Sequence, residues 1–244
     1  MRRFYAVPEN FQDEKVTLGA DETKHLRDVL RLREGEKVRV FNGLGREFLC
    51  EIRAISKKET VLEINEEIKP SAPESDLDLT LAVALLKGEK FELVLQKAVE
   101  LGVSKFVPLV TKRSEVKIKD AEKKLERWRK IILEASKQSG RAKLMRIQVP
   151  VEFDFFVRDS SSERADDESF VLFSERGGDG FSSIEAAKKI TAVTGAEGGW
   201  EDSEINLAQV SGFRIVTFGG RIMRAETAAI AVTAVLQNRF GDLV

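Results

Sequence analysis

Two short glycine-containing segments near the end of the chain are the residues best suited to binding a small molecule. Thr194–Gly199 reads TGAEGG and Phe218–Arg221 reads FGGR, and each follows an apolar run typical of a buried strand. Glycine lets a backbone turn through positive φ and approach a ligand closely, and α/β proteins place binding sites at the turns that end strands. The pattern predicts one pocket formed by both turns, although tight connections in an ordinary sheet would use the same glycines.

A cluster of charged residues follows the second turn. Arg221–Thr227 places two arginines and a glutamate at the start of a strongly apolar, helix-like stretch. A helix N-terminus favours negative charge, so Glu226 suits its position on structural grounds alone. Two arginines are costly to bury unpaired, so we expect Arg221 and Arg224 to meet either carboxylates or an anionic ligand.

Residue type and spacing exclude several other kinds of site. Neither glycine turn has the GxxxxGK[ST] pattern of a phosphate-binding loop or the GxGxxG pattern of a dinucleotide-binding fold. A single cysteine, Cys50, excludes a disulfide framework within the chain. A single histidine, His25, excludes a multi-histidine metal site and makes a Ser-His-Asp triad hard to assemble. No metal is expected.

Composition indicates a globular protein with a real core. The 244 residues are 42% hydrophobic and 33% charged, which suits one large domain or two ordinary ones. The first residues lack a signal peptide's apolar region, and no stretch approaches the ~20 apolar residues of a membrane span. We therefore expect a cytoplasmic protein without a membrane partner.

The charge of the chain is unevenly distributed. The net charge is -1, yet the segment from Lys105 to Arg146 holds 14 basic and 5 acidic residues. A polyanion responds to a local patch rather than to the total charge. This segment is therefore a candidate nucleic-acid contact, although a solvated helix face would have the same composition.

Residues 1–70 predict a small β-barrel followed by a linker. The expected strands are Arg3–Ala6, Lys15–Leu18, Lys37–Phe41, Glu47–Ile55 and Thr60–Asn65, and the expected helix runs from Asp21 to about Arg33 with Leu26, Val29 and Leu30 on its buried face. Asn42–Gly45 is a hairpin signal. Lys69–Ser75 contains two prolines and two serines, and we place a domain boundary there.

The second part of the chain alternates buried-type strands with helices, which predicts a mostly parallel sheet covered on both faces. Expected strands are Leu79–Leu86, Lys105–Val110, Arg146–Val149, Phe170–Phe173, Ile190–Val193 and Phe213–Phe218; expected helices are Glu89–Leu101, Ala121–Ser139, Ser183–Lys188, Asp202–Gln209 and Glu226–Arg239. The polar stretch Asp159–Ser169 is expected to be a loop.

The motifs together resemble the RsmE family of small-subunit ribosomal RNA (uracil-N3) methyltransferases, which belong to the knotted SPOUT class. The matching segments, in the family's order from Met1 to about Arg239, are MRRFYA, HLRDVLR, ALLKGEKFELVLQKAVELGVSKFVPLVTKRS, WRKIILEASKQSGR, TGAEGG and FGGRIMRAETAAIAV. Some positions depart from the family pattern. Ala196 replaces the proline of GPEGG, Phe218-Gly219 replaces leucine-glycine, Met223 replaces leucine and Ala225 replaces threonine.

The resemblance implies a fold and a cofactor. Residues 1–70 would form a PUA-like RNA-binding β-barrel, and residues 76–244 a SPOUT α/β domain with a deep trefoil knot that acts as a homodimer. The cofactor would be S-adenosyl-L-methionine. By motif, its contacts would be Leu172, Phe173, Ser174, Gly195, Glu197, Gly198, Gly199, Phe218, Gly219, Ile222 and Met223.

The implied activity is methylation of N3 of a specific uridine in the 16S ribosomal RNA of the small subunit. Uracil N3 carries a proton at neutral pH, so the proton must leave and negative charge develops on the ring. Arg221 or Arg224 would stabilise that charge, and Glu226 would orient an arginine or accept the proton. RNA contacts would come from Arg2, Arg3, His25, Arg27 and Arg31 in the first domain and from Lys87, Arg113 and Arg141 in the second.

Two other functions remain compatible with the residues. One is a SPOUT methyltransferase that modifies another RNA position, because the pocket glycines recognise the cofactor and not the base. The other is a non-catalytic RNA-binding or ribosome assembly factor that uses the barrel and the basic segment.

Overall fold

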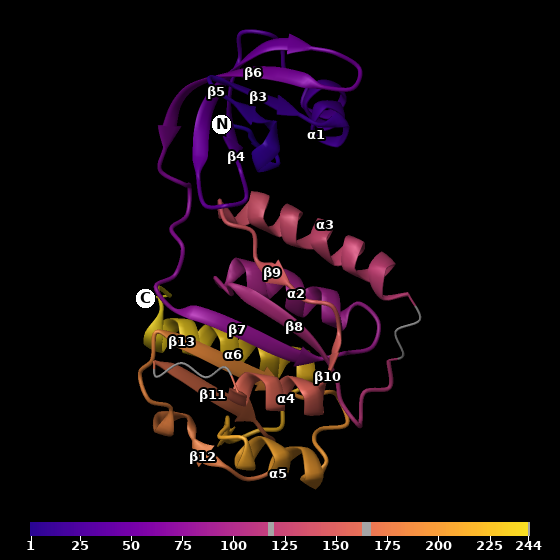
Figure 1. The fold of residues 1–244 in the computed structure, drawn as a ribbon, viewed down its shortest axis with the longest axis vertical. Helices are drawn as coiled ribbons and strands as arrows, with labels where there is room; N and C mark the ends of the chain where they lie inside the picture. The colour runs from indigo at the N-terminus through magenta and orange to yellow at the C-terminus, as the bar shows by residue number, and fades with distance from the viewer. Residues whose placement is uncertain (117–119, 163–166, 244) are drawn as a thin grey trace. The chain divides into compact units, whose positions relative to one another are not determined.

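The computed structural model describes residues 1–116, 120–162 and 167–243, and the chain divides into two compact units. The first unit comprises residues 1–74 and 136–144, and the second comprises residues 75–135 and those from 145 onward (Figure 1). A short segment, residues 136–144, thus belongs with the N-terminal unit although it lies far along the chain.

The first unit is built on a six-stranded sheet in its described residues. The strands are β1 (Arg3–Tyr5), β2 (Phe11–Gln12), β3 (Lys15–Leu18), β4 (Lys37–Phe41), β5 (Glu47–Ile55) and β6 (Thr60–Ile68), in the order β1-β4-β5-β6-β3-β2. Every neighbouring pair is antiparallel except β1 and β4. The predicted strands are confirmed, with the last one extended beyond Asn65. Alternate residues of these strands form one core, as in Val38 and Val40 of β4.

The helix predicted from Asp21 to Arg33 is shorter and differently wound. Helix α1 is Ala20–Lys24 with Gly19 as its N-cap, and the chain continues as a π-helix, η2 (His25–Val29). The Leu30 amide donates to the His25 carbonyl at 3.0 Å, which adds a residue to the turn. The helical chain then ends at a left-handed residue, Arg31, with φ +54°. The added residue shifts the register of the faces, so Val29 is exposed rather than buried. A short 3-10 turn, η1 (Pro8–Asn10), completes this unit's regular structure in the described residues.

The thiol of Cys50 gives a test of this core. Burial raises the pKa of the Cys50 thiol from 9.0 to about 12. The folded state therefore favours the neutral thiol, and this contribution to stability is complete below pH 9 and is lost as the pH rises to about 12. We expect the folded protein to resist alkylation by iodoacetamide at pH 8.5, whereas the denatured protein takes up one adduct by mass spectrometry. Equal labelling rates in the two states would contradict the burial.

The second unit contains a parallel sheet. In the described residues its strands are β7 (Asp78–Ala84), β8 (Lys105–Val110), β9 (Arg146–Ile147), β10 (Val151–Glu152), β11 (Glu168–Phe173), β12 (Asp179–Gly180), β13 (Lys189–Thr194) and β14 (Arg214–Thr217). Their order is β10-β8-β7-β13-β11-β14-β12, with β9 pairing β8 at the side. Every pairing between them is parallel.

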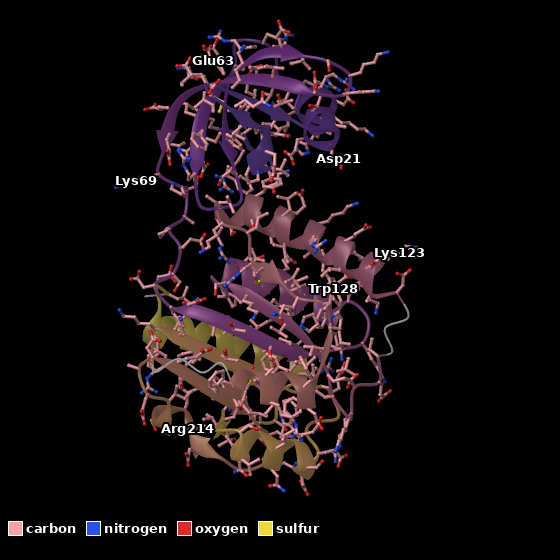
Figure 2. The ribbon with its side chains drawn as sticks, viewed as in Figure 1. Asp21, Glu63, Lys69, Lys123, Trp128 and Arg214 are labelled. Atoms are coloured by element: carbon pink, nitrogen blue, oxygen red, sulfur yellow. The ribbon has the colours of Figure 1, made fainter. Side chains whose placement is uncertain are left out.

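Helices cover both faces of this sheet, as predicted. They are α2 (Lys90–Glu100), α3 (Ala121–Ser139), α4 (Phe153–Ser162), α5 (Asp202–Val210) and α6 (Ala225–Phe240). Phe106 of β8 packs on Phe91 of α2, which in turn lies against Trp128 of α3 with ring centroids 4.8 Å apart. Figure 2 labels Trp128 on α3. The next residue along β8, Val107, joins a different cluster with Phe153 of α4. Successive strand residues point to opposite faces, so α2 and α4 lie on opposite sides of the sheet.

Two predictions for the second unit are wrong. Ser183–Lys188 is not a helix, because only the 3-10 turn η3 (Phe181–Ser183) forms and the chain beyond it is irregular. Arginine side chains bind the carbonyls of this turn: Arg214 donates to Ser183 O at 2.5 Å and Arg239 to Phe181 O at 2.8 Å. The Phe181 carbonyl also accepts the Ile184 amide of the 3-10 turn at 3.3 Å, whereas the Ser183 carbonyl accepts the Arg214 side chain.

The second wrong prediction concerns Asp159–Ser169. Residues 159–162 belong to α4 and residues 168–169 to β11, while residues 163–166 lie outside the described residues. The helix was signalled by Phe153, Phe156 and Val157, which recur at helical spacing and are all buried. Within the described chain, no helix combines the length and apolar character needed to cross a membrane.

Candidate active site

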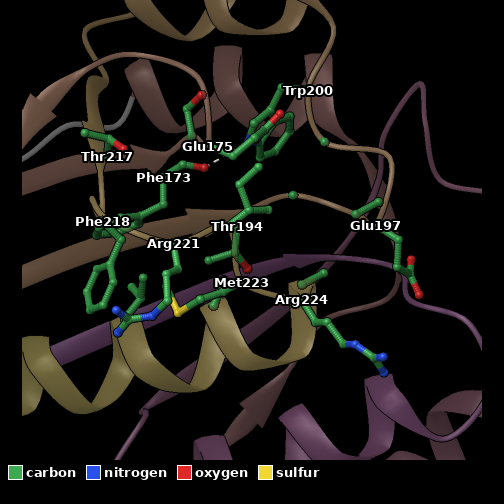
Figure 3. Close-up of a pocket in the computed structure, with 18 of the residues that line it drawn as sticks. Phe173, Glu175, Thr194, Glu197, Trp200, Thr217, Phe218, Arg221, Met223 and Arg224 are labelled. Carbon is green, nitrogen blue, oxygen red and sulfur yellow. Dashed lines mark hydrogen bonds between the residues drawn. The ribbon is translucent and has the colours of Figure 1, made fainter.

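A cavity of about 540 Å³ lies where β11, β13 and β14 end. Its walls come from the residues that follow these strands, together with side chains from the starts of α2 and α6 (Figure 3). The lining residues are Lys90, Phe173 to Glu175, Thr194 to Trp200, Thr217 to Ala225, Ala228 and Val232. Both glycine segments thus line one cavity, as their spacing predicted.

The structure brings almost all the predicted cofactor contacts into this wall. Phe173, Ser174, Gly195, Glu197, Gly198, Gly199, Phe218, Gly219, Ile222 and Met223 line the cavity. Leu172 does not, because it is fully buried in the core below the site. Lys90, Glu175 and Trp200 also line the cavity but were not predicted, because no glycine or charge pattern in the sequence pointed to them.

The first turn, Gly195–Gly199, is closed and tightly packed. The Gly199 amide donates to the Ala196 carbonyl at 3.0 Å, and Gly199 has φ +68°. A Cβ at Gly195 would lie 3.0 Å from the Trp200 ring, and one at Gly198 would lie 3.0 Å from Arg113. A side chain at Gly195 or Gly198 would crowd these neighbours, and the positive φ of Gly199 favours glycine there.

Arg113 and Trp200 hold this turn in place. The Arg113 guanidinium donates to Glu201 Oε1 at 2.6 Å and to the Gly198 carbonyl at 2.9 Å. The hydrogen bond from Arg113 lowers the pKa of the Glu201 carboxyl. The Trp200 indole is 1% exposed and donates to the Phe173 carbonyl at 2.9 Å, which links the turn after β13 to the end of β11. Arg113, which was predicted to bind RNA, is therefore engaged by the glycine turn and Glu201.

Glu197 at the tip of the turn is held from the other side. Its Oε1 accepts from Lys90 Nζ at 3.1 Å and from the Lys87 amide at 3.2 Å. Burial on its own would raise the pKa of the Glu197 carboxyl, but hydrogen bonds from its own amide, the Lys87 amide and Lys90 together lower it. Glu197 therefore braces the turn as an anion.

The second turn, Phe218–Arg224, carries both arginines of the charged cluster. Arg221 and Arg224 are exposed, line the cavity and point away from each other (Figure 3). Within residues 1–116, 120–162 and 167–243, no ion pair or hydrogen bond engages either guanidinium. The sequence led us to expect either carboxylates or an anionic ligand as partners of these arginines. The described residues provide no carboxylate partner. The arginines remain available to an anionic ligand.

Glu226 lies in the first turn of α6, with Arg224 as the N-cap. Its side chain is 13% exposed, and its Oε2 is buried without a hydrogen-bond partner among the described residues. Lys90 Nζ lies 3.9 Å from that oxygen. Arg221 and Arg224 line the cavity, whereas Glu226 is not among its lining residues and lies beside it in the first turn of α6.

Aromatic rings support the apolar side of the cavity. Phe173 and Phe218 both line it, and Phe181 packs against each, with ring centroids 6.1 and 5.7 Å apart. Phe181 belongs to the η3 turn that Arg239 holds. The 3-10 turn that precedes the wrongly predicted helix Ser183–Lys188 therefore supports the pocket.

Two of the arginines predicted to bind RNA, Arg3 and Arg141, are engaged inside the first unit. Within the first unit, Arg3 donates to Glu47 at 3.0 Å and to the carbonyls of Ser136 and Arg141, at 2.9 and 2.8 Å. Arg141 is 4% exposed and pairs with Glu74 at 2.6 Å. Buried charges need such partners, so these contacts stabilise the first unit.

The other predicted RNA contacts lie at the surface. Arg27 pairs with Asp28 at 2.7 Å, and Lys87 pairs with Glu115. Arg2, His25 and Arg31 are exposed, and His25 has an edge contact with Phe4. In the basic segment, Lys123, Arg129 and Lys130 are exposed on α3, whereas Lys117 and Lys119 lie outside the described residues.

Comparisons with known proteins identify the family. A family model described as an RNA methyltransferase domain matches residues 73–237, and one described as an RNA methyltransferase PUA domain matches residues 18–65. The ribosomal RNA small subunit methyltransferase E of Synechocystis is 35% identical over 95% of this chain and 76% of its own length. The chain belongs to the ribosomal RNA small subunit methyltransferase E family. The Aquifex aeolicus member is 31% identical over 98% of this chain and 100% of its own length.

A solved structure of the methyltransferase E family shows the same fold. The Neisseria gonorrhoeae enzyme, bound to S-adenosyl methionine, covers 100% of both chains with a TM-score of 0.90 and 31% identity. Together with the PUA match, this confirms the predicted α/β fold with an N-terminal PUA-like barrel.

Proposed function

We propose that the protein transfers a methyl group from S-adenosylmethionine to N3 of a specific uridine in the 16S ribosomal RNA of the small subunit. The observation that carries this proposal is the cavity in which two glycine turns and two unpaired arginines meet. Family membership supports the substrate, and the cofactor is the molecule bound by the Neisseria gonorrhoeae relative.

The cavity suits S-adenosylmethionine in size and lining. Ligand pockets for molecules of this kind commonly span about 300–1,000 Å³, and this one has about 540 Å³. Backbone groups of Gly195–Gly199 and Phe218–Met223 would hold the cofactor's polar ring, and Phe173 would cover an apolar surface. When bound, the cofactor supplies an electrophilic methyl group on a sulfonium.

The remaining chemistry falls to the chain's own side chains. Loss of the N3 proton puts negative charge on the uracil oxygens, which a guanidinium can stabilise by hydrogen bonds. Arg221 and Arg224 are free to do so because no carboxylate in the described chain pairs with them. Glu226 pairs with neither arginine in the described residues, and its Oε2 lacks a hydrogen-bond donor; with the base bound, it would orient an arginine or accept the proton. Positioning of the base against the methyl group supplies the rest of the rate enhancement.

RNA binding is assigned to exposed cations and to one exposed imidazole. Arg2, Arg31 and His25 are candidates in the PUA-like unit, and the exposed lysines and arginines of α3 are candidates in the second unit. Arg3 and Arg141 are left out of this surface because their guanidinium groups are already bonded internally. Phosphate contacts of this kind make log affinity fall linearly with log salt. A cytoplasmic location fits a ribosomal substrate.

We extend the proposal to a homodimer and a trefoil knot, which the resemblance implied. Helix α6 supports the dimer, because the apolar residues Ile230, Ala231, Ala234 and Val235 are only partly buried. The sheet order supports the knot, because β11 lies between β13 and β14, two strands that follow it in the chain.

The test is methylation of small ribosomal subunits that lack the modification, with isotope-labelled S-adenosylmethionine and mass analysis of the nucleosides. We expect 3-methyluridine as the labelled product. We also expect the affinity of the protein for the ribosomal subunit to fall steeply as the salt concentration rises. Another methylated nucleoside would overturn the uridine assignment and favour a different RNA position. If a calorimetric titration shows that the protein does not bind S-adenosylmethionine, a non-catalytic RNA-binding function is favoured.

A further inference from the structure

Lys90, at the start of α2, is a cation placed between the two halves of the site. Its Nζ lies 3.1 Å from Glu197 Oε1 and 3.9 Å from Glu226 Oε2. Glu197 belongs to the glycine turn after β13, and Glu226 belongs to the first turn of α6. One ammonium group therefore contacts the turn predicted to hold the cofactor and the carboxylate predicted to act on the base.

The two carboxylates depend on Lys90 to different degrees. Glu197 also accepts hydrogen bonds from backbone amides, so it keeps partners when Lys90 is lost. Glu226 Oε2 is buried with no hydrogen bond, and within the described residues Lys90 is the cation within 4.0 Å of it. A buried carboxylate without a compensating charge is costly, so it would move or take up a proton if Lys90 were removed.

The contacts of Lys90 are not those of a generic surface lysine. Lys97 lies on the same helix at nearly the same exposure, 36% against 37%, yet it pairs only locally, with Glu100 of α2. Lys90 of α2 instead pairs with two residues that are distant in the chain, Glu197 in the turn after β13 and Glu226 in α6. It also lines the cavity, whereas Lys97 does not.

We propose that Lys90 is a positioning residue with two separable effects, fixing Glu197 for cofactor binding and Glu226 for methyl transfer. The second effect rests on the proposed function, whereas the first requires only that the cavity bind S-adenosylmethionine. Lys90 acts through the two carboxylates, so removing either carboxylate removes the corresponding effect.

The first experiment is a double-mutant cycle on cofactor binding, read by calorimetry without RNA. Lys90→Met is expected to raise the dissociation constant of S-adenosylmethionine about threefold to tenfold in the parent protein. In the Glu197→Gln background the same change is expected to alter it less than about twofold. Equal factors in both backgrounds would show that Lys90 does not act through Glu197 and would overturn the first effect.

The second experiment is a cycle on the rate of methyl transfer at saturating cofactor. Lys90→Met is expected to slow transfer about tenfold to a hundredfold in the parent protein, because Glu226 loses its compensating charge. In the Glu226→Gln background the loss is expected to be less than about twofold. An equal loss in both backgrounds would overturn the second effect.

Two further variants separate positioning from a general structural role. Lys90→Arg keeps the charge and is expected to restore both readouts to within about threefold of the parent. Lys97→Met removes the matched lysine of α2 and is expected to leave both unchanged. If Lys97→Met weakens cofactor binding and slows methyl transfer as much as Lys90→Met does, the role assigned to Lys90 is wrong.

The two cycles also distinguish this inference from the proposed function. A parent protein that binds the cofactor but methylates another nucleoside fails the uridine assignment, yet both cycles can be read on that product. A parent protein that methylates no RNA fails the proposed function, and the cofactor cycle with Glu197→Gln still decides whether Lys90 positions the turn.

Discussion

Replacing Arg224 with methionine is expected to lower the rate of methyl transfer about 10²- to 10³-fold, which is the usual effect of removing one preorganised donor to a developing oxyanion. Arg224 is the N-cap of α6, lines the cavity, and has no ion pair within the described residues. Among the described residues its guanidinium makes no hydrogen bond or ion pair that the substitution would break, so we expect the loss in the chemical step. We expect the dissociation constant of S-adenosylmethionine to change less than about threefold.

The comparison with Arg221→Met assigns the roles of the two arginines. They diverge in the cavity, so one uracil oxygen anion cannot bind both in the arrangement seen here (Figure 3). We expect one variant to lose far more activity than the other, with Arg224 the more sensitive because it is the N-cap of α6, the helix that carries Glu226 in its first turn. Arg158→Met is the control, since Arg158 is exposed on α4 and does not line the cavity. Arg224→Met with near-parental turnover would exclude Arg224 from the chemistry.

Replacing Trp200 with alanine is expected to lower the free energy of unfolding of the second unit by about 3–5 kcal/mol. Trp200 is 1% exposed, packs on Phe153 with ring centroids 5.0 Å apart, and belongs to the core cluster that underlies the sheet. Its ring also fills the space beside Gly195 and holds the glycine turn to the end of β11. The variant should therefore lose both stability and cofactor affinity, measured by denaturant unfolding and calorimetry.

Trp200→Phe separates the two contributions of this residue. Phenylalanine keeps much of the buried ring and removes the hydrogen bond to the Phe173 carbonyl, which leaves that buried carbonyl without its indole donor. We expect a smaller loss of stability, about 1–3 kcal/mol, with a measurable weakening of cofactor binding. If Trp200→Ala binds the cofactor as tightly as the parent, the ring does not shape the cavity.

Local patterns account for the elements that were predicted well. The strands of the first unit alternate buried and exposed residues, and α2, α3, α5 and α6 repeat apolar residues at helical spacing or begin and end at recognisable signals. The helix predicted over Ser183–Lys188 is absent, and side chains from distant elements, Arg214 and Arg239, bind carbonyls of the 3-10 turn Phe181–Ser183 that leads into this segment. Composition and spacing within the segment carry no information about those arginines.

The amino-acid sequence by itself determined the two-part α/β organisation, the pairing of two glycine turns in one pocket, and the family. Glycine spacing and apolar periodicity are local properties of the sequence, so they can be recognised without the folded structure. The tertiary structure decided which charged residues are free. Arg3, Arg113 and Arg141 are bonded internally, whereas Arg221 and Arg224 have no such bond to any described residue, and Lys90 joins Glu197 and Glu226. An ion pair depends on neighbours that are distant in the chain, so only the fold can show which cations are left for a ligand.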